Sequence, residues 1–302
     1  MNTSSHYRIS VIVPVHNRTA LLRRALTSLH SQMADNFEVI VVDDGSDDNI
    51  EQIVHPFGRS RFRLVRQAKS GAAAARNLGV ANSHGEYVTF LDSDDEALPT
   101  WLSDFDKLAT SQHPQPWVVC LGARRVDDAS GATTLIPPHD MGPLFKSITG
   151  HFLAGAYAIQ RKLFEQAGGF DAQMPAGQHT ELALRLCEFL AQQPNMIVNG
   201  ENVGVVIHNH SEAKIRRDHR AILVATKLLL AKHEDAFANF PRLRSKQLAT
   251  AAVSAYKLRL RRESLRLHWQ ACRTDIRNVK NWARLCLTVL GIRGMTRSRR
   301  GA

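Results

Sequence analysis

The chain has 302 residues, of which 44% are hydrophobic and 22% charged, an ordinary composition for a globular protein with one large domain and a smaller appendage. No stretch approaches the roughly 20 apolar residues of a membrane span, and the first ten residues hold no apolar signal core, so we expect a cytoplasmic protein. The four cysteines lack metal-binding spacing, which fits a reducing compartment.

The net charge of +11 is unevenly distributed along the chain. Residues 241–302 contain 16 Lys and Arg against 2 Asp and Glu, whereas residues 1–240 contain 23 against 26. The body is therefore close to neutral and the C-terminal segment is strongly basic. This distribution indicates an anionic partner for that segment rather than for the body.

The first 95 residues alternate between short apolar runs and helical patterns. Uninterrupted apolar runs predict strands that are buried on both faces, at Arg8–Val15, Phe37–Val42, Phe62–Val65 and Tyr87–Leu91. Between them, the residue patterns predict helices at Thr19–Gln32, Asp47–Phe57 and Gly71–Ser83. Strands that alternate with helices predict an α/β fold with a mostly parallel, right-handed sheet flanked by helices.

Further elements follow in the second half of the chain. Strands are predicted at Trp117–Gly122, Thr133–Ile136 and Val203–Ile207, and helices at Pro99–Ala109, Arg161–Ala167 and Thr180–Gln192. His151–Ile159 is an apolar, glycine-containing segment.

Two of the predicted strands end in carboxylates. Asp43 and Asp44 follow the second strand, and Asp92, Asp94 and Asp95 follow the fourth. Ligands of open α/β sheets bind outside the carboxyl ends of the strands, and acids on two neighbouring strands would converge there. Such acids repel one another unless a cation is present, and hard oxygen ligands suit Mg²⁺ or Mn²⁺. The sequence therefore predicts a divalent-metal site at Asp92-Ser93-Asp94, with a solvated acidic turn as the alternative.

Four motifs in this order resemble those of the family 2 glycosyltransferases of the GT-A fold. They are Val13–Asn17, Val41–Asp47, Gly71–Gly79 and Phe90–Asp95, and a later Gly168–Asp171 turn is similar to that family's GGFD turn. The resemblance implies a Rossmann-like catalytic domain at residues 1–215, with a donor half at about 8–122 and an acceptor half at about 123–215. Residues 216–302 would form a basic helical extension.

The resemblance also implies roles for individual residues. Residues beside the nucleotide-sugar donor would be Pro14, His16, Asn17, Asp43, Asp44, Arg76, Asp92 and Ser93. Within this set Asp44 would contact the base, since a carboxylate accepts the imide N–H of uracil or thymine. Arg76 would bind the diphosphate, with a surface arginine as the alternative. Asp94 would hold the metal ion, and His208 or His210 would complete its coordination, with two solvent-exposed histidines as the alternative.

The general base is where the sequence departs from the family pattern. An inverting transfer needs one base for the acceptor hydroxyl, and the family supplies an Asp from a Glu-Asp pair at a helix start. Gln178 and His179 occupy those positions here. A neutral imidazole is well suited to the task, so His179 is one candidate and Glu181, two positions further on, is the other. Alternatively His179 caps the helix, and the protein binds a donor with little turnover.

The basic C-terminal segment is predicted to be helical at Arg217–Phe240, Gln247–His268 and Val279–Ile292. Basic amphipathic helices suit an anionic membrane surface, with Trp269 and Trp282 at the interface. This interpretation places the protein at the inner face of the membrane, near a lipid-linked glycan acceptor. The alternative is a solvated helical bundle packed on the catalytic domain. No nucleic-acid-binding motif occurs, which makes a nucleic-acid partner the lesser option.

The sequence thus predicts an enzyme that moves a sugar from a UDP- or dTDP-type donor to a hydroxyl of a glycan or lipid-linked glycan, with inversion and with Mn²⁺ or Mg²⁺. One alternative is a catalytically weak donor-binding protein. A second is a metal-dependent nucleotidyltransferase, which the loop His16-Asn17-Arg18 argues against because such enzymes carry a Gly-rich loop there. The absence of GxGxxG after the first strand disfavours a dinucleotide-binding oxidoreductase.

Overall fold

The computed structural model describes residues 7–209 and 218–291. Its contacts divide the chain into two compact units. The sheet unit comprises residues 1–173 with 178–211, and the helical unit comprises residues 174–177 with 212–302.

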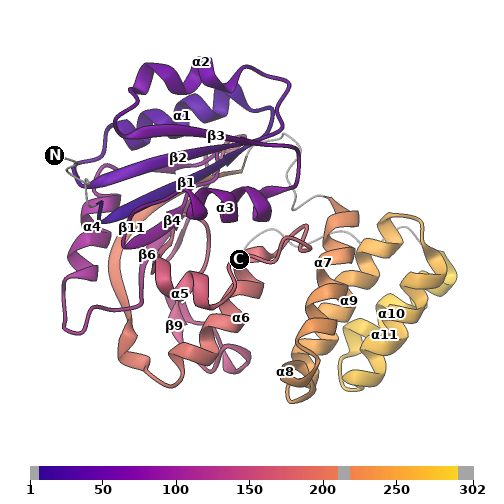
Figure 1. The fold of residues 1–302 in the computed structure, drawn as a ribbon. Coiled ribbons are helices and arrows are strands. Elements are labelled where there is room, and N and C mark those ends of the chain that lie inside the picture. Colours follow the sequence, from indigo (N-terminus) through magenta and orange to yellow (C-terminus); the bar gives the residue numbers. More distant parts are fainter. Residues whose placement is uncertain (1–6, 210–217, 292–302) are drawn as a thin grey trace. The chain divides into compact units, whose positions relative to one another are not determined.

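A mixed sheet forms the centre of the sheet unit (Figure 1), in the order β3-β2-β1-β4-β10-β6-β11-β5 with β7 paired to β6. The strands are β1 (Ile9–Val15), β2 (Phe37–Asp44), β3 (Phe62–Gln67), β4 (Tyr87–Phe90), β5 (Glu96–Ala97), β6 (Val118–Asp127), β7 (Thr133–Ile136), β10 (Tyr157–Gln160) and β11 (Ile197–Asn209). The first four are mutually parallel, as predicted, and β6 is parallel to β11. A separate pair contains β8 (His139–Asp140) and β9 (Thr149–Gly150).

Helices cover both faces of this sheet (Figure 1) and explain its apolar strands. They are α1 (Thr19–His30), α2 (Ile50–Val54), α3 (Ala72–Ala81), α4 (Trp101–Ala109), α5 (Arg161–Gln166) and α6 (Gln178–Leu190). Val11 and Val13 of β1 share one core with α1 and α4. Ile12, between them in sequence, belongs to a second core with α3, α5 and α6. Since successive side chains of a strand point to opposite faces, β1 is buried on both sides.

The sheet differs from the prediction in several respects, one of which is the unpredicted strand β5. β10 lies antiparallel between β4 and β6. This strand was not predicted, because Gly155 lies within the apolar segment that contains it. The strands β6 and β11 are longer than predicted, because polar residues such as Asn199 continue their pairing. The expectation that the two acid-ending strands are neighbours was wrong, since β1 lies between β2 and β4.

The helical unit contains α7 (His219–Lys232), α8 (Glu234–Ala238), α9 (Pro241–Lys257), α10 (Arg261–Thr274) and α11 (Val279–Leu290). The predicted helix 217–240 is wrong in extent, because it is interrupted at His233. The predicted helix 247–268 is also wrong, because the chain turns at Arg259, whose φ is +62°, before α10 begins. Periodicity missed both interruptions because neither contains Gly or Pro.

Small residues form the core of the helical unit, where α9 packs on α10. Ala251, Ala252 and Ala255 of α9 and Ala271 of α10 are fully buried. Ser245 Oγ donates to the Ala271 carbonyl at 2.8 Å, which satisfies a buried hydroxyl. Across residues 7–209 and 218–291, no helix combines the length and the apolar character needed to cross a bilayer.

Candidate functional site

The loops that follow β1, β2 and β4 meet at the carboxyl end of the sheet. Asn17, after β1, binds the loop after β2 through three hydrogen bonds. Its backbone N–H donates to Ser46 Oγ at 3.0 Å, its Nδ2 donates to Asp47 Oδ2 at 3.2 Å, and its Oδ1 accepts from the Asp47 N–H at 2.8 Å. Asn17 has φ +49°, a conformation that Asn tolerates better than most residues. This predicted donor residue therefore fixes two loops of the site relative to one another.

Three other residues that were predicted to border the donor lie at or just beyond the carboxyl ends of β1 and β2. Pro14 is buried in β1, and His16, just beyond it, is half-buried with a buried Nδ1 that has no hydrogen-bond partner among the described residues. Asp43 is buried, accepts a hydrogen bond from the Ser46 N–H at 2.9 Å and lies 3.2 Å from Arg66 Nε. Asp43 thus stabilises the turn that follows β2.

Asp44 accepts hydrogen bonds from the loop before α3. Its Oδ1 accepts from Gln67 Nε2 and from the Ser70 N–H, both at 2.7 Å, and its Oδ2 accepts from the Gly71 N–H at 2.8 Å. A carboxylate has about four acceptor positions, so acceptor capacity remains for a donor group of a ligand. The same bonds hold the start of α3 beside the end of β2.

Asp92, Asp94 and Asp95 come together in the loop after β4. One carboxylate oxygen from each lies within 4.8 Å of the others, which makes this the metal-capable cluster of the described residues. Asp94 and Asp95 are buried, and the intervening Ser93 is buried with them. Three carboxylates supply hard oxygen ligands of the kind that Mg²⁺ and Mn²⁺ prefer, so the donor set fits such an ion.

Two arginines of the α1 region contribute positive charge to this cluster. Arg18 Nη1 lies 3.2 Å from Asp94 Oδ2, and Arg24 Nη2 donates to the Asp94 carbonyl at 2.6 Å. The Arg18 contact was not predicted, although His16-Asn17-Arg18 follows a strand that points at the site. These contacts partly offset the repulsion between the carboxylates.

Arg76, on α3, connects the metal-capable cluster to the start of α6. Its Nη2 donates to Asp92 Oδ1 at 2.6 Å and its Nη1 to Gln178 Oε1 at 2.7 Å, while its guanidinium lies 5.5 Å from the centre of the Phe170 ring. Burial acts to raise the pKa of Asp92, but the positive charges of Arg76 and Arg18 outweigh it and hold that pKa below its ordinary value. Asp92 is therefore ionised at neutral pH.

His179 lies in an aromatic pocket at the start of α6. Its Nδ1 is 3.0 Å from Tyr157 Oη, and its buried Nε2 has no hydrogen-bond partner among the described residues. The rings of Phe90 and Phe170 lie edge-on to it, with centroids 6.0 and 4.9 Å away. Burial lowers the pKa of His179 to about 3; Arg76 lowers it as well, and Asp92 opposes them. The imidazole is neutral at physiological pH.

Glu181, the other candidate base, is bound to Arg185. Arg185 Nε donates to Oε1 at 2.9 Å and Arg185 Nη2 to Oε2 at 2.5 Å. The same guanidinium donates to the carbonyls of Ala167 and Gly169. Both oxygens of Glu181 therefore position the arginine that fixes the Gly168-Gly169 turn.

His208, at the end of β11, lies between two carboxylates that the sequence did not single out. Its Nδ1 is 2.9 Å from Asp128 Oδ1, its Nε2 is 2.8 Å from Glu96 Oε1, and its backbone N–H donates to Asp95 Oδ1 at 3.0 Å. The side chain thus faces Glu96 and Asp128 rather than the metal-capable cluster. His210, the alternative metal ligand, lies outside the described residues.

The motif at 71–79 combines chemistry with packing. Asn77 Nδ2 donates to the Phe170 carbonyl at 2.7 Å and Asn77 Oδ1 accepts from the Phe170 N–H at 2.9 Å. A Cβ at Gly79 would lie 2.3 Å from Ile12 Cγ2, so only glycine lets α3 approach β1 this closely. Asn77 and Tyr157 are site residues that we did not predict; the motif could have indicated Asn77, whereas nothing in the sequence distinguishes Tyr157.

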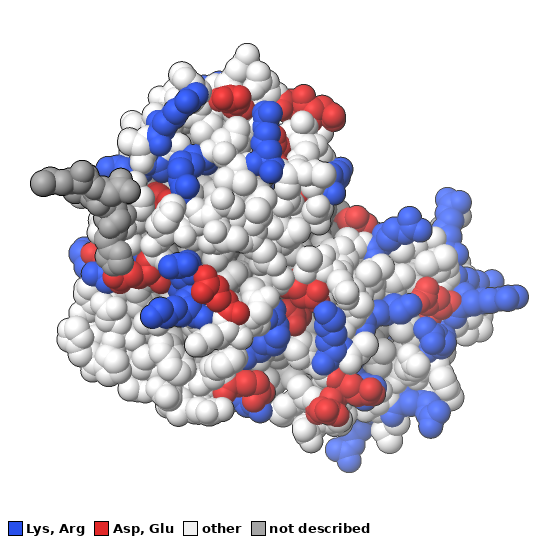
Figure 2. All heavy atoms as spheres, in the orientation of Figure 1, with Lys and Arg blue, Asp and Glu red and all other residues white. Residues whose placement is uncertain are grey.

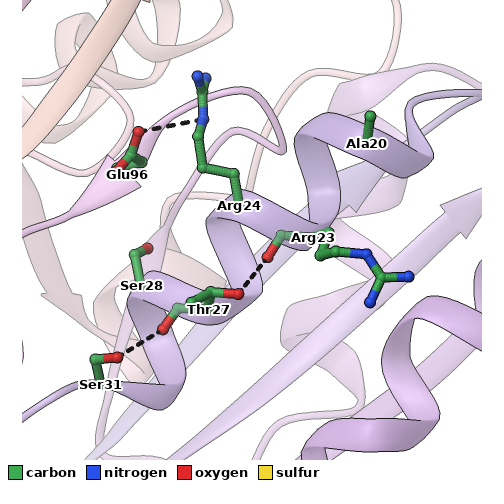
Figure 3. Close-up of a pocket in the computed structure, with 7 residues that line it drawn as sticks. All are labelled: Ala20, Arg23, Arg24, Thr27, Ser28, Ser31 and Glu96. Carbon is green, nitrogen blue, oxygen red and sulfur yellow. Dashed lines mark hydrogen bonds and ion pairs between the residues drawn. The ribbon is translucent and has the colours of Figure 1, made fainter.

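A separate hollow of about 420 Å³ runs along α1 (Figure 3). It is lined by Ala20, Arg23, Arg24, Thr27, Ser28, Ser31 and Glu96. Arg24 Nε lies 3.2 Å from Glu96 Oε1, and the hydroxyls of Thr27 and Ser31 bond to carbonyls of their own helix. None of the predicted site residues lines this hollow.

The fold is that of known GT-A proteins. The crystal structure of S. aureus TarS residues 1–349 in complex with UDP-GlcNAc superimposes with a TM-score of 0.61, covering 94% of this chain and 92% of that one. The sequence identity is 17%, so the likeness concerns the fold alone. It confirms the predicted fold class, a mostly parallel sheet flanked by helices with further helices at the C-terminal end.

The chain belongs to glycosyl transferase family 2, whose family model matches residues 10–168, more than half of the chain. An uncharacterized glycosyltransferase of Rickettsia felis is 43% identical over 89 residues, 29% of this chain and 15% of that protein. The GalNAc(5)-diNAcBac-PP-undecaprenol beta-1,3-glucosyltransferase of Campylobacter jejuni is 36% identical over 118 residues, 38% of each. The chain thus spans well under two thirds of the length of these curated relatives.

Proposed function

We propose that this protein transfers a sugar, with inversion, from a UDP- or dTDP-type donor to a hydroxyl of a glycan or lipid-linked glycan, using Mn²⁺ or Mg²⁺. The observation that carries the proposal is the juxtaposition of Asp92, Asp94 and Asp95 with Arg76 and His179 at one end of the sheet. Support also comes from the family membership, from the UDP-GlcNAc bound to TarS and from the undecaprenol-linked substrate in the name of the Campylobacter relative.

In this proposal the donor lies across the ends of β1, β2 and β4. Asp44 accepts the imide N–H of the base with its remaining acceptor capacity, while Pro14, His16, Asn17 and Asp43 border the nucleoside. Arg76 binds the diphosphate, and Asp92 with Ser93 binds the ribose or the sugar. Arg76 exchanges part of its contact with Asp92 for the phosphate oxygens, which are the stronger anionic partner.

Asp94, with Asp92 and Asp95, would hold the divalent ion. A bound Mn²⁺ or Mg²⁺ would offset the negative charge that develops on the departing diphosphate. Arg18 adds a fixed positive charge 3.2 Å from Asp94, on the same side of the loop. His208 remains a proposed ligand only if its side chain turns toward the cluster when the ion binds, and His210 is the alternative proposed ligand.

His179 is the proposed general base. This role requires the tautomer in which Nδ1–H donates to Tyr157 Oη and Nε2 carries the lone pair. Nε2 accepts the proton of the acceptor hydroxyl as that oxygen attacks the anomeric carbon. The low pKa keeps the imidazole unprotonated before the donor binds, and the negative diphosphate then favours the imidazolium that forms. Glu181 is the weaker candidate, because Arg185 occupies both of its oxygens.

The first experiment is a thermal-shift panel with UDP, dTDP, GDP and CDP, each with and without Mn²⁺. A nucleotide at about 100 times its dissociation constant stabilises the folded protein by about 2.7 kcal/mol. We expect UDP or dTDP to stabilise the protein in the presence of metal, and Asp94→Ala to abolish the shift. Asp35→Ala, at a fully exposed carboxylate, is the matched control and should leave the shift intact.

Activity is tested by release of the nucleoside diphosphate from the donor that this panel identifies. His179→Ala should lower turnover by roughly 10²–10⁴-fold while leaving the thermal shift in place. His84→Ala, at an exposed histidine, is the control. Donor binding without hydrolysis or transfer by the unaltered protein would favour the catalytically weak donor-binding alternative, and no shift with any nucleotide would refute the donor site itself.

A further inference from the structure

Helix α11 turns polar residues inward and apolar residues outward. Asn281 and Thr288 are its buried residues, and Asn281 Nδ2 donates to Ser245 Oγ of α9 at 2.8 Å. On the opposite side, the side chains of Val279 and Leu290 are 76% and 69% exposed. This is the reverse of the usual amphipathic helix, whose apolar stripe faces its own core.

The outward residues form a continuous stripe along the helix. Val279, Trp282, Ala283, Cys286 and Leu290 recur at intervals of three and four, which places them on one side. None of them is buried, and Ala283 and Cys286 are exposed. Among the described residues of the helical unit, an apolar stripe of three turns is thus left largely uncovered.

The stripe continues onto α10 through an aromatic contact. The ring of Trp269 meets that of Trp282 edge-on, with centroids 6.0 Å apart, and Trp282 Nε1 donates to the Ile276 carbonyl at 3.0 Å. Trp269 and Ile276 are themselves exposed. We call the combined surface the α10–α11 face; it consists of Trp269, Ile276, Val279, Trp282, Ala283, Cys286, Val289 and Leu290.

Exposed apolar side chains are concentrated on this part of the described chain. Ten large hydrophobic residues are exposed among all the described residues, and six of them lie between residues 260 and 290, a tenth of the sequence. Isolated exposed apolar residues are normal on soluble proteins, but a contiguous group of them marks an interaction surface.

Positive charge surrounds the α10–α11 face. Residues 258–291 contain eight Lys and Arg against two Asp and Glu, and Arg273, Arg277 and Lys280 are exposed between or beside the apolar residues. In the view of Figure 2, Lys and Arg predominate over the helices that Figure 1 shows in yellow. The surface therefore requires an occupant that is both apolar and anionic.

We propose that the α10–α11 face binds the surface of a lipid bilayer with anionic headgroups. The apolar stripe enters the boundary between headgroups and acyl chains, the tryptophans lie at headgroup level, and Arg277 and Lys280 meet lipid phosphates. A nucleic acid complements the charge but leaves the apolar stripe in water. The inference rests on the helical unit, so it stands or falls independently of the proposed sugar transfer.

The test is sedimentation of the full chain with vesicles of phosphatidylcholine, alone or mixed equally with phosphatidylglycerol. We expect binding to the mixed vesicles, weakened by added salt. Val279→Ser with Leu290→Ser should weaken it by roughly tenfold or more. The matched control is Met33→Ser with Leu135→Ser, which alters two equally exposed apolar residues of the sheet unit, 70% and 65% exposed, and should have no effect.

The charge contribution has its own matched pair. Arg277→Gln with Lys280→Gln should weaken binding roughly tenfold, whereas Arg59→Gln with Lys162→Gln, also one exposed arginine and one exposed lysine, should not. A polarity-sensitive dye on Cys286 should shift its emission to the blue only with the mixed vesicles.

Three results would overturn the proposal. They are no sedimentation with phosphatidylglycerol vesicles, equal losses in the face and control pairs, and self-association that Val279→Ser with Leu290→Ser removes, which would identify a second copy of the chain as the occupant. The nucleotide thermal shift of the face variants should equal that of the unaltered protein, so loss of vesicle binding is distinguishable from loss of the donor site.

Discussion

At the scale of single residues, a neutral histidine, His179, lies where the family pattern has a carboxylate. The residue before it is the neutral Gln178 instead of a carboxylate. Arg76 donates one hydrogen bond to the amide of Gln178 and pairs its positive charge with Asp92. Within the part of the chain that the structure describes, Tyr157 is the hydrogen-bond partner of His179 Nδ1. The pair Gln178-His179 was predictable by alignment, but Tyr157 is brought to it by β10, a strand that the sequence did not reveal.

Tyr157→Phe tests whether this hydroxyl selects the tautomer of His179. Without it, Nδ1 and Nε2 compete for the proton, so we expect turnover to fall by roughly tenfold with the Michaelis constant for the donor unchanged. Steady-state kinetics over a range of pH would measure both. Tyr87→Phe, which removes a buried hydroxyl bonded to the Pro116 carbonyl, is the control for a merely structural loss. Equal effects of the two changes on turnover would contradict the assignment.

The buried imidazole also makes stability depend on pH. Because the folded pKa of His179, about 3, lies below the unfolded value of about 6.5, the unfolded chain binds the extra proton as pH falls through this window. Stability is therefore fully present above pH 6.5 and is lost on acidification. Between about pH 7 and about pH 5 this residue alone accounts for up to about 2 kcal/mol. Urea unfolding of the unaltered protein and of His179→Asn should diverge by that amount, whereas parallel pH profiles would show that the imidazole is not buried as described.

At the scale of elements, the fold was predictable where local pattern and tertiary position agree. The strands β1, β2 and β4 are buried on both faces, so each is an uninterrupted apolar run. Such a run can be recognised as a strand without knowing which strands pair with it. The helix interruptions at His233 and Arg259 have no local signal, since neither contains Gly or Pro. Likewise the two carboxylates beside His208 come from β5 and from the turn after β6, which only the sheet order brings together.

Gly79→Ala tests the close approach of α3 to β1 and β2. Helix propensity alone predicts a gain of about 1 kcal/mol for this change. We expect a net loss of stability instead, since overpacking costs about 1–3 kcal/mol and the new Cβ would lie 2.3 Å from Ile12 Cγ2 and 3.1 Å from Val42 Cγ2. Chemical denaturation gives the sign. Ala81→Ser, at the exposed end of the same helix, is the control, and a stabilised Gly79→Ala protein would contradict this packing.

At the scale of the whole molecule, the candidate site and the excess positive charge belong to different units. The carboxylate cluster and His179 belong to the sheet unit, and the basic, outwardly apolar helices belong to the helical unit. Composition alone predicted this asymmetry, because net charge needs no structure to be counted. The direction in which α11 faces was not predictable, because a helical wheel identifies an apolar side but not whether that side is buried.

Thiol reactivity gives a test of the whole fold. Cys120, Cys187 and Cys272 are buried and Cys286 is exposed. Burial raises the pKa of both Cys120 and Cys187 to about 12, which further suppresses the reactive thiolate. A colorimetric thiol reagent should therefore titrate one thiol rapidly in the native protein and four in urea. Cys286→Ser should remove the rapid reaction, and a second fast thiol in that variant would contradict the burial pattern.

The insertion of β10 between β4 and β6 has a consequence for folding during synthesis on the ribosome. β4 pairs with β10 across roughly 70 residues of sequence, which take roughly 4–14 s to synthesise. During that interval the parallel strands made first leave the backbone groups of β4 unpaired along this edge, and an unpaired strand edge is a template for aggregation. Tyr157 is part of the strand that covers this edge, and its hydrogen-bond partner His179 follows later in the chain, at the start of α6.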